Sequence, residues 1–407
     1  MSEGSLTGVL VALVVIVAAG GAVYLAFRRP SVRAGEDRYL QALELWVAGE
    51  RRAAADLLRR VVQDDPDAID PFLQLGILLR ELGDPQRAAI LHRSLTVRPD
   101  LGNRKKVTVG LALADDLVAL GHWAEAAAVL DQLEPRAGGL ARYVWLRFAE
   151  RHGRGELPEA ARTLKRAMRH GPVEDRPAFR EAYGRYQLDR ALEHARRHEG
   201  APAEARLKDV QDLPEAATRA AYVRALLAAQ RGDAAAAVEA VTDAMLDRPE
   251  DLSVVWPSLQ EVLLETGQYD RIVPILENAT SESEAPPRLW VALALLYEKL
   301  GRRDRAVRLL EAKRGDPRFT PDVAAPYLRL LVADEGSPDL QAVWGALAPP
   351  DARERSSRWR CPSCGRIDEA VRWFCPQCRN FGDYVKAGRN SAVTAGVEPA
   401  PAAPVRF

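Results

Sequence analysis

A regular spacing of glycines runs through most of this 407-residue chain and restricts its fold more than any other feature. Most of the intervals lie close to about 34 residues, a length that indicates one pair of helices per repeat. The glycines are Gly49, Gly83, Gly121, Gly155, Gly200, Gly232, Gly267 and Gly301. Five positions after them come Ala54, Ala88, Ala126, Ala160, Ala205, Ala237, Ile272 and Ala306.

Both recurring residues have a physical reason to occupy their positions. Glycine tolerates the positive φ that a chain needs to leave one helix and begin the next. Alanine lets two helices cross closely, where a larger side chain would separate them. We therefore expect an all-α array over residues 36–350, with eight helical pairs and one further pair between Pro321 and Leu347.

This pattern resembles the tetratricopeptide repeat, which has the same period. The resemblance implies a superhelix with a long concave face, a surface that commonly holds a protein or a peptide. The units around Gly155 and Gly200 fit less well, because Arg147, Arg151 and Arg196 occupy slots where apolar residues are usual. The register of the middle repeats therefore stays open.

All four cysteines of the chain lie in one short segment near its C-terminus. They form two Cys-x-x-Cys pairs separated by ten residues, and they are Cys361, Cys364, Cys375 and Cys378. Two such turns can close a tetrahedral site of four thiolates, which suits either zinc or iron. We expect one structural metal ion in a small module over residues 357–386, a four-cysteine knuckle of the zinc-ribbon kind. A redox-active dithiol pair is the alternative.

The residues around the cysteines support a compact knuckle. Gly365 follows the first cysteine pair and supplies a flexible backbone there, whereas Arg379 holds the equivalent position after the second pair. A small apolar shell is expected from Trp359, Trp373, Phe374, Phe381 and Tyr384. A unit of this size cannot fold through burial alone, so the metal must carry much of its stability.

The N-terminal part of the chain contains an uncharged apolar run over residues 6–27. The run is long enough to cross a bilayer as a helix, which takes about 20 residues. Arg28, Arg29 and Arg33 follow the run, so the positive-inside rule places residues 1–5 outside and the rest of the chain in the cytoplasm. A cleaved signal peptide fits less well, because no Lys or Arg precedes the run. A reducing cytoplasm also suits thiols that hold a metal.

Charge and motif content argue against several functional classes. The chain carries 57 basic and 57 acidic residues, which gives no electrostatic sign of nucleic-acid binding. Acidic residues interleave with the arginines around the knuckle, which are Arg353, Arg355, Arg358, Arg360, Arg366 and Arg372. Arginine exceeds lysine by 50 to 7 in the whole chain, so compositional bias explains them better than nucleic acid does.

The remaining aromatic and histidine residues show no catalytic pattern. His92 and His122 lack the spacing of a metal or catalytic site, and we expect them to be surface residues or internally hydrogen-bonded ones. Packing roles are expected for Trp46, Trp256, Trp290 and Trp344. No nucleophile triad, zinc-protease or phosphate-loop motif occurs, so we do not expect an enzyme. Residues 387–407 are rich in Ala, Val, Pro and Gly and are predicted to be a disordered tail.

The complete arrangement resembles the lipopolysaccharide assembly protein B (LapB, or YciM) family. The resemblance depends on the order of elements, on the opening "RYLQALELWVAGE" of the first repeat, and on the terminal "RCPSCG…WFCPQCR". It implies a rubredoxin-like metal module packed against the repeats of a bacterial inner-membrane protein. It also implies an adaptor that couples the deacetylase LpxC to the membrane protease FtsH and so limits lipid A synthesis. A general scaffold for envelope assembly, without a protease, is the alternative, and homo-oligomer formation stays open.

Overall fold

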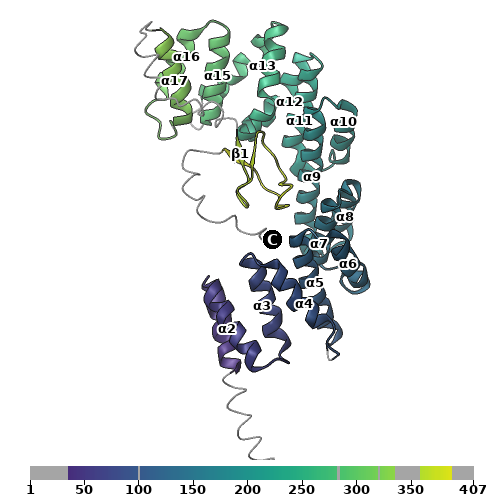
Figure 1. Cartoon of the computed structure of the whole chain (residues 1–407). Coiled ribbons are helices and arrows are strands. Elements are labelled where there is room, and N and C mark those ends of the chain that lie inside the picture. Colours follow the sequence, from purple (N-terminus) through teal and green to yellow (C-terminus); the bar gives the residue numbers. More distant parts are fainter. Residues whose placement is uncertain (1–34, 100, 282–284, 320, 335–357, 387–407) are drawn as a thin grey trace, which may run out of the picture. The chain divides into compact units, whose positions relative to one another are not determined.

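The computed structural model describes residues 35–99, 101–281, 285–319, 321–334 and 358–386 (Figure 1). The predicted N-terminal tip over residues 1–5, the predicted membrane helix over residues 6–27 and the predicted tail over residues 387–407 lie outside these ranges. Among the described residues, no helix combines the length and the apolar character needed to cross a bilayer. The chain divides into two compact units, with the boundary between Leu157 and Pro158.

Unit one consists of helices, beginning with a helix over residues 35–47. The helices that follow are α2 (Arg51–Asp64), α3 (Ile69–Glu81), α4 (Pro85–Thr96), α5 (Asn103–Leu120), α6 (Trp123–Ala137) and α7 (Ala141–Gly153). Small and branched side chains fill the space between neighbouring helices: Ala54 and Leu58 of α2 pack in one buried cluster with Leu75 and Leu78 of α3. Each fully buried Leu contributes about 1.5–3 kcal/mol, so burial of one helix face holds each pair together.

Unit two continues the helical pattern and ends in a small sheet. Its helical elements are α8 (Leu157–His170), η1 (Val173–Asp175), α9 (Arg176–Arg196), α10 (Gly200–Asp209), η2 (Pro214–Ala216), α11 (Ala217–Gln230), α12 (Ala234–Asp247), η3 (Pro249–Val254), α13 (Trp256–Glu265), η4 (Tyr269–Arg271), α14 (Val273–Ser281), α15 (Pro287–Lys299), α16 (Arg303–Ala312) and α17 (Pro321–Asp334). Helix α17 supplies the first helix of the pair expected after Pro321, and the rest of that pair lies outside the described residues.

The turn glycines adopt the predicted backbone conformation in seven of the eight cases. Their φ angles lie between 68° and 93°, and they are Gly49, Gly83, Gly121, Gly155, Gly232, Gly267 and Gly301. The residue five positions later is fully buried in each of these units. The sequence prediction of paired helices joined by a left-handed turn residue is therefore confirmed at these positions, and the residue five positions later is a buried alanine in every case except Ile272.

The prediction for Gly200 is wrong by two positions. Gly200 begins α10, and the left-handed turn residue is His198, with φ 60°. The residue five positions after His198 is Ala203, which is fully buried, whereas Ala205 is exposed. Histidine tolerates this conformation better than most non-glycine residues. With the turn placed at His198, the interval to Gly232 matches the regular period of the repeats.

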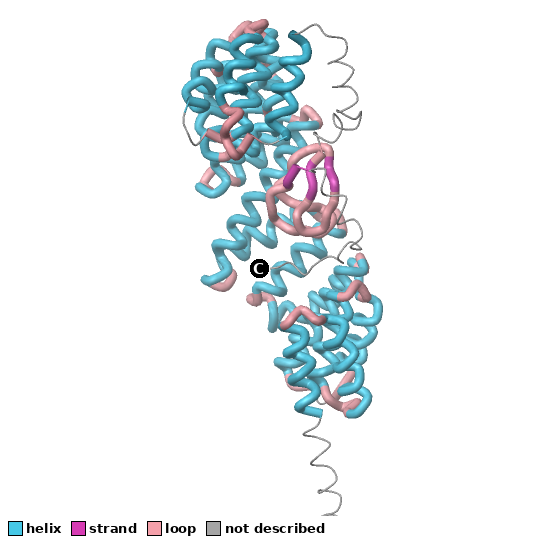
Figure 2. Tube along the Cα trace, turned by 90° about the vertical axis from the view of Figure 1, so that its left-hand side faces the viewer, coloured by secondary structure: helices cyan, strands magenta, loops and turns pink. Residues whose placement is uncertain are grey.

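The only β-structure among the described residues belongs to the four-cysteine module (Figure 2). Its strands are β1 (Trp359–Arg360), β2 (Ile367–Asp368) and β3 (Val385–Lys386), in the order β2-β1-β3. Both pairings are antiparallel: Trp359 lies opposite Asp368 on one side and opposite Lys386 on the other. The described chain is thus an all-α, tetratricopeptide-like helical repeat with a C-terminal four-cysteine knuckle, as predicted from the sequence.

Candidate metal centre and its docking site

The first cysteine pair forms a tight turn closed by two backbone hydrogen bonds. The N–H of Cys361 donates to the carbonyl of Arg366 at 2.8 Å, and the N–H of Gly365 donates to the carbonyl of Cys361 at 3.0 Å. Gly365 has φ 76°, the left-handed conformation for which glycine is best suited. This turn brings the Cys361 and Cys364 side chains to the same side of the loop.

The second cysteine pair repeats this geometry with different residues. The N–H of Cys375 donates to the carbonyl of Asn380 at 3.0 Å, and the N–H of Arg379 donates to the carbonyl of Cys375 at 2.8 Å. Arg379 has φ 58° and therefore takes the place of Gly365 despite its side chain. An arginine in this conformation costs about 1–2 kcal/mol relative to an ordinary backbone.

The four sulfur atoms converge on one point, since all lie within 4.8 Å of one another. The Sγ atoms of Cys361 and Cys378 are 3.7 Å apart, and so are those of Cys364 and Cys375. A tetrahedral ion with metal–sulfur bonds of about 2.3 Å holds its ligands about 3.8 Å apart. A disulfide would need about 2.05 Å. The spacing therefore fits four thiolates around a single metal ion, and it does not distinguish zinc from iron.

The surroundings of the sulfurs make a cation chemically necessary if all four are to be thiolates. Cys361, Cys375 and Cys378 are buried, and Cys364 is half-buried. Burial raises the pKa of the Cys364 thiol to about 11, whereas the hydrogen bond from Cys378 lowers the pKa of Cys375 to about 4. The site favours a mixture of thiols and thiolates until a positive charge balances the latter.

The predicted aromatic shell is present around the two turns. Trp359, Trp373, Phe374 and Tyr384 are buried, and Phe381 is half-buried. The rings of Phe374 and Phe381 stand 4.9 Å apart, and the two residues also form an isolated β-bridge. These contacts link the second cysteine turn to the segment that leads into β3.

Trp373 attaches the knuckle to the helices of unit two. Its backbone N–H donates to Oδ1 of Asp189 in α9, and its Nε1–H donates to Oδ1 of Asp251 in η3, both at 3.1 Å. The guanidinium of Arg219 in α11 faces the indole ring at 5.9 Å. The Trp373 side chain is fully buried. Its backbone N–H, its indole N–H and the face of its ring each have a partner in the repeats.

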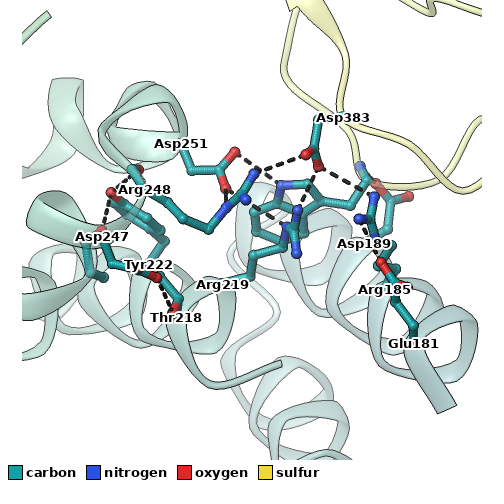
Figure 3. A network of polar contacts seen from close by, with 12 residues as sticks. Glu181, Arg185, Asp189, Thr218, Arg219, Tyr222, Asp247, Arg248, Asp251 and Asp383 are labelled. Carbon is teal, nitrogen blue, oxygen red and sulfur yellow. Dashed lines mark hydrogen bonds and ion pairs between the residues drawn. The ribbon is translucent and has the colours of Figure 1, made fainter. Parts of the chain in front are cut away.

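A second attachment centres on Asp383, whose carboxylate meets three arginines (Figure 3). Asp383 Oδ1 lies 2.6 Å from Arg219 Nη2 and 3.4 Å from Arg185 Nη1, while Oδ2 lies 2.9 Å from Arg248 Nη2. Arg185 belongs to α9, Arg219 to α11, and Arg248 lies between α12 and η3. Burial opposes ionisation of Asp383, but these guanidinium groups outweigh it and lower the pKa of the carboxyl.

Further contacts extend this interface along the repeats. Arg372 Nη1 lies 3.1 Å from Asp189 Oδ2, and Arg196 donates to the carbonyl of Val371 at 3.1 Å. Burial raises the pKa of Asp189 to about 6, and Arg372 and the Trp373 N–H only partly offset this effect. The Phe374 ring meets Tyr186 of α9 edge-on, with the centroids 5.2 Å apart. The knuckle is thus seated on α9, α11 and η3.

Sequence reasoning identified the four cysteines but missed the docking residues Asp189, Asp251 and Asp383. Arg196 was assigned to an apolar slot only because the turn was expected at Gly200. With the turn at His198, Arg196 lies two residues before the turn, where other repeats also have charged residues, and it donates to the Val371 carbonyl of the knuckle. Arg147, in unit one, contacts Tyr143 and Glu150 of its own helix and also pairs with Asp131 of α6. Arg151 is half-buried.

The other residues considered from the sequence have structural surroundings. His92 is fully buried, with Nδ1 at 2.5 Å from Asp116 Oδ2 and Nε2 at 3.1 Å from the Leu73 carbonyl. His122 is half exposed beside Glu125. Trp290 is fully buried and Trp46 is partly buried in the repeat core, as expected.

The sequence also predicted packing roles for two further tryptophans and no nucleic-acid contact for the arginines around the knuckle. The structure describes some of these residues. Trp256 is half-buried at the start of α13, and Trp344 lies outside the described residues. Among the knuckle arginines, Arg366 pairs with Asp368, and Arg372 pairs with both Asp368 and Asp189. Charges used in this way favour a structural role for these two arginines over contact with nucleic acid.

Comparison with known proteins supports the repeat assignment. A tetratricopeptide repeat family model matches residues 263–325, from the end of α13 into α17. No curated protein matches the chain. The matched segment and the helical pairs described above identify a tetratricopeptide-like repeat, a scaffold that typically binds proteins.

Several solved structures are similar at low sequence identity. A tetratricopeptide repeat protein from Parabacteroides merdae is 16% identical, covers 74% of this chain and 99% of its own, and has a TM-score of 0.28. The APC/C hetero-tetramer Cut9-Hcn1 is 15% identical, covering 72% and 55%, with a TM-score of 0.29. Naa15/Naa10 bound to HypK-THB is 16% identical, covering 74% and 49%, with a TM-score of 0.37. Scores this low carry no argument about shape or partners.

Proposed function

We propose that this protein is a membrane-anchored adaptor of the bacterial inner membrane, with residues 1–5 in the periplasm and its repeats and knuckle in the cytoplasm. The apolar run over residues 6–27 would anchor it, and the arginines that follow would set its orientation. The repeats would bind a protein partner, and the anchor would raise the effective concentration of partners in the same membrane.

We further propose that the adaptor limits lipid A synthesis by bringing an LpxC-like deacetylase to an FtsH-like protease. The observation that supports this most is the docking of the knuckle on α9 and α11 through Trp373 and Asp383. A metal module packed against the repeats is what the resemblance to the lipopolysaccharide assembly protein B family implies. The four cysteines would hold one zinc or iron ion and stabilise that module.

The test is to deplete the protein in its own cell and to measure the half-life of LpxC after translation is stopped. We expect the half-life to lengthen severalfold and to return to normal with the wild-type chain. The matched variants are a chain that begins at residue 28, which lacks the anchor, and Cys361→Ser, which lacks a metal ligand. Both should fail to restore the short half-life.

An unchanged LpxC half-life after depletion would refute the protease link and would favour the general scaffold. Purification from intact membranes with a tagged chain would then identify the proteins that the scaffold holds. Reporter fusions placed after residue 386 test the orientation separately: alkaline phosphatase should be inactive and a cytoplasmic fluorescent protein should be bright. The opposite pair of results would contradict the proposed topology.

A further inference from the structure

The repeat surface beneath the knuckle carries a concentration of positive charge that the knuckle neutralises. The side chains of Arg219, Arg185 and Arg248 are only 7%, 17% and 23% exposed, and all three lie within 3.4 Å of the Asp383 carboxylate. Figure 3 shows them converging on Asp383 from α9, from α11 and from the junction between α12 and η3. Without this carboxylate, partly buried guanidinium groups would repel one another at short range.

The same surface also contains two carboxylates that the knuckle contacts, of which Asp251 also pairs with Arg248 of the repeats at 2.9 Å. Asp189 is 5% exposed and Asp251 is 1% exposed, and each accepts a hydrogen bond from Trp373. A buried acceptor that loses its donor costs about 1–3 kcal/mol, and more when it is charged. The covered surface is therefore complementary to the knuckle in charge and in hydrogen bonding.

The knuckle presents these groups only while its two turns are held together. Trp373 lies two residues before Cys375, and Asp383 lies five residues after Cys378. The strands of the module are two residues long, so little backbone pairing fixes these segments. A module this small depends on its metal for folding. Loss of the ion would release both docking segments together.

We propose that the knuckle is a metal-dependent cover for the α9, α11 and η3 surface of the repeats. With the ion bound, the module is docked and the surface is closed. Without it, the module detaches while the repeats stay folded, and the arginines and carboxylates of this surface become accessible together with the site that holds the Trp373 ring. Metal content would thereby control which surface the repeats offer to other proteins.

Hydroxyl-radical footprinting of the purified full chain in detergent tests this directly. The reporter is Tyr186, which is 1% exposed and contacts Phe374 of the knuckle. The internal control is Tyr222, which is fully buried and donates to the Ala244 carbonyl at 2.9 Å within the repeats. Removing the metal with a chelator under reducing conditions should raise oxidation of Tyr186 at least fivefold and leave Tyr222 unchanged. Added Zn²⁺ should reverse the effect.

Asp383→Arg separates docking from metal binding, because it reverses the charge facing the three guanidinium groups and keeps all four cysteines. We expect one metal ion per chain by elemental analysis, together with oxidation of Tyr186 at the metal-free level. Protection of Tyr186 in the metal-free wild-type chain would overturn the proposal. A parallel rise in oxidation of Tyr222 would also overturn it, since the repeats would then unfold together with the knuckle.

Discussion

Replacing Asp383 by asparagine should loosen the knuckle by a predictable amount. Removing one partner of a fully buried ion pair costs about 3–5 kcal/mol, whereas an exposed pair is worth about 0–1 kcal/mol. The Asp383 side chain is 37% exposed and that of Arg219 is 7% exposed, so solvent screens the interaction in part. We place the loss of docking free energy between these limits, at about 2 kcal/mol.

Hydrogen exchange of the peptide that contains Trp373 measures this loss, because the Trp373 amide donates to Asp189 across the interface. A loss of about 2 kcal/mol corresponds to opening that is about 30-fold more frequent. The matched control is Glu181→Gln, since Glu181 pairs with Arg185 at 2.7 Å but is 55% exposed. That change should accelerate exchange by about twofold at most.

A double-mutant cycle identifies the pair responsible. If Asp383 acts through Arg219, the double variant Asp383→Asn/Arg219→Gln should lose less docking free energy than the sum of the losses in the two single variants. The reasoning is refuted if Asp383→Asn accelerates exchange no more than Glu181→Gln does. Metal content should be measured in every variant, so that loss of the ion is not mistaken for loss of docking.

The remaining predictions test the repeats and the metal site. His198→Gly should raise stability by up to about 1 kcal/mol in thermal unfolding, because glycine suits its positive φ better, and the matched Gly301→Ala should lower it by a similar amount; equal signs would contradict this. Gly76→Ala would place a Cβ 2.4 Å from Nε2 of His92 and should lower stability by about 1–3 kcal/mol; an unchanged unfolding temperature would refute this steric argument. Cys361→Ser should abolish stoichiometric metal while the far-UV circular dichroism stays helical; a full complement of metal would contradict the four-ligand site.

The repeat array was predictable because its signals are local. A left-handed turn residue and a small crossing residue recur at a fixed distance, and each exerts its effect within one helical pair. The convergence of the four cysteines was predictable for the same reason, since the spacing within and between the two cysteine pairs lets all four sulfurs meet. The prediction failed at Gly200, where a non-glycine residue two positions earlier adopts the turn conformation.

The docking interface was not predictable because its partners are far apart in the sequence. Asp383 and Arg185 are separated by 198 residues, and Trp373 and Asp251 by 122. In the sequence, each of these charges is indistinguishable from an ordinary solvent-exposed residue of an arginine-rich chain. Arg196 gave no indication either, because its misfit to the repeat pattern came from expecting the turn at Gly200 instead of at His198.

The separation between Asp383 and its arginines also determines the order of events during synthesis. Helical pairs contact their neighbours and can form while the ribosome is still translating, whereas the segment that neutralises Arg185, Arg219 and Arg248 emerges after these helices. A nascent chain interrupted before residue 358 would expose three adjacent guanidinium groups and two carboxylates without their tryptophan donor. Synthesis of the knuckle and capture of the ion would together hide that surface, so a chain that lacks the knuckle would differ chemically from one that has it.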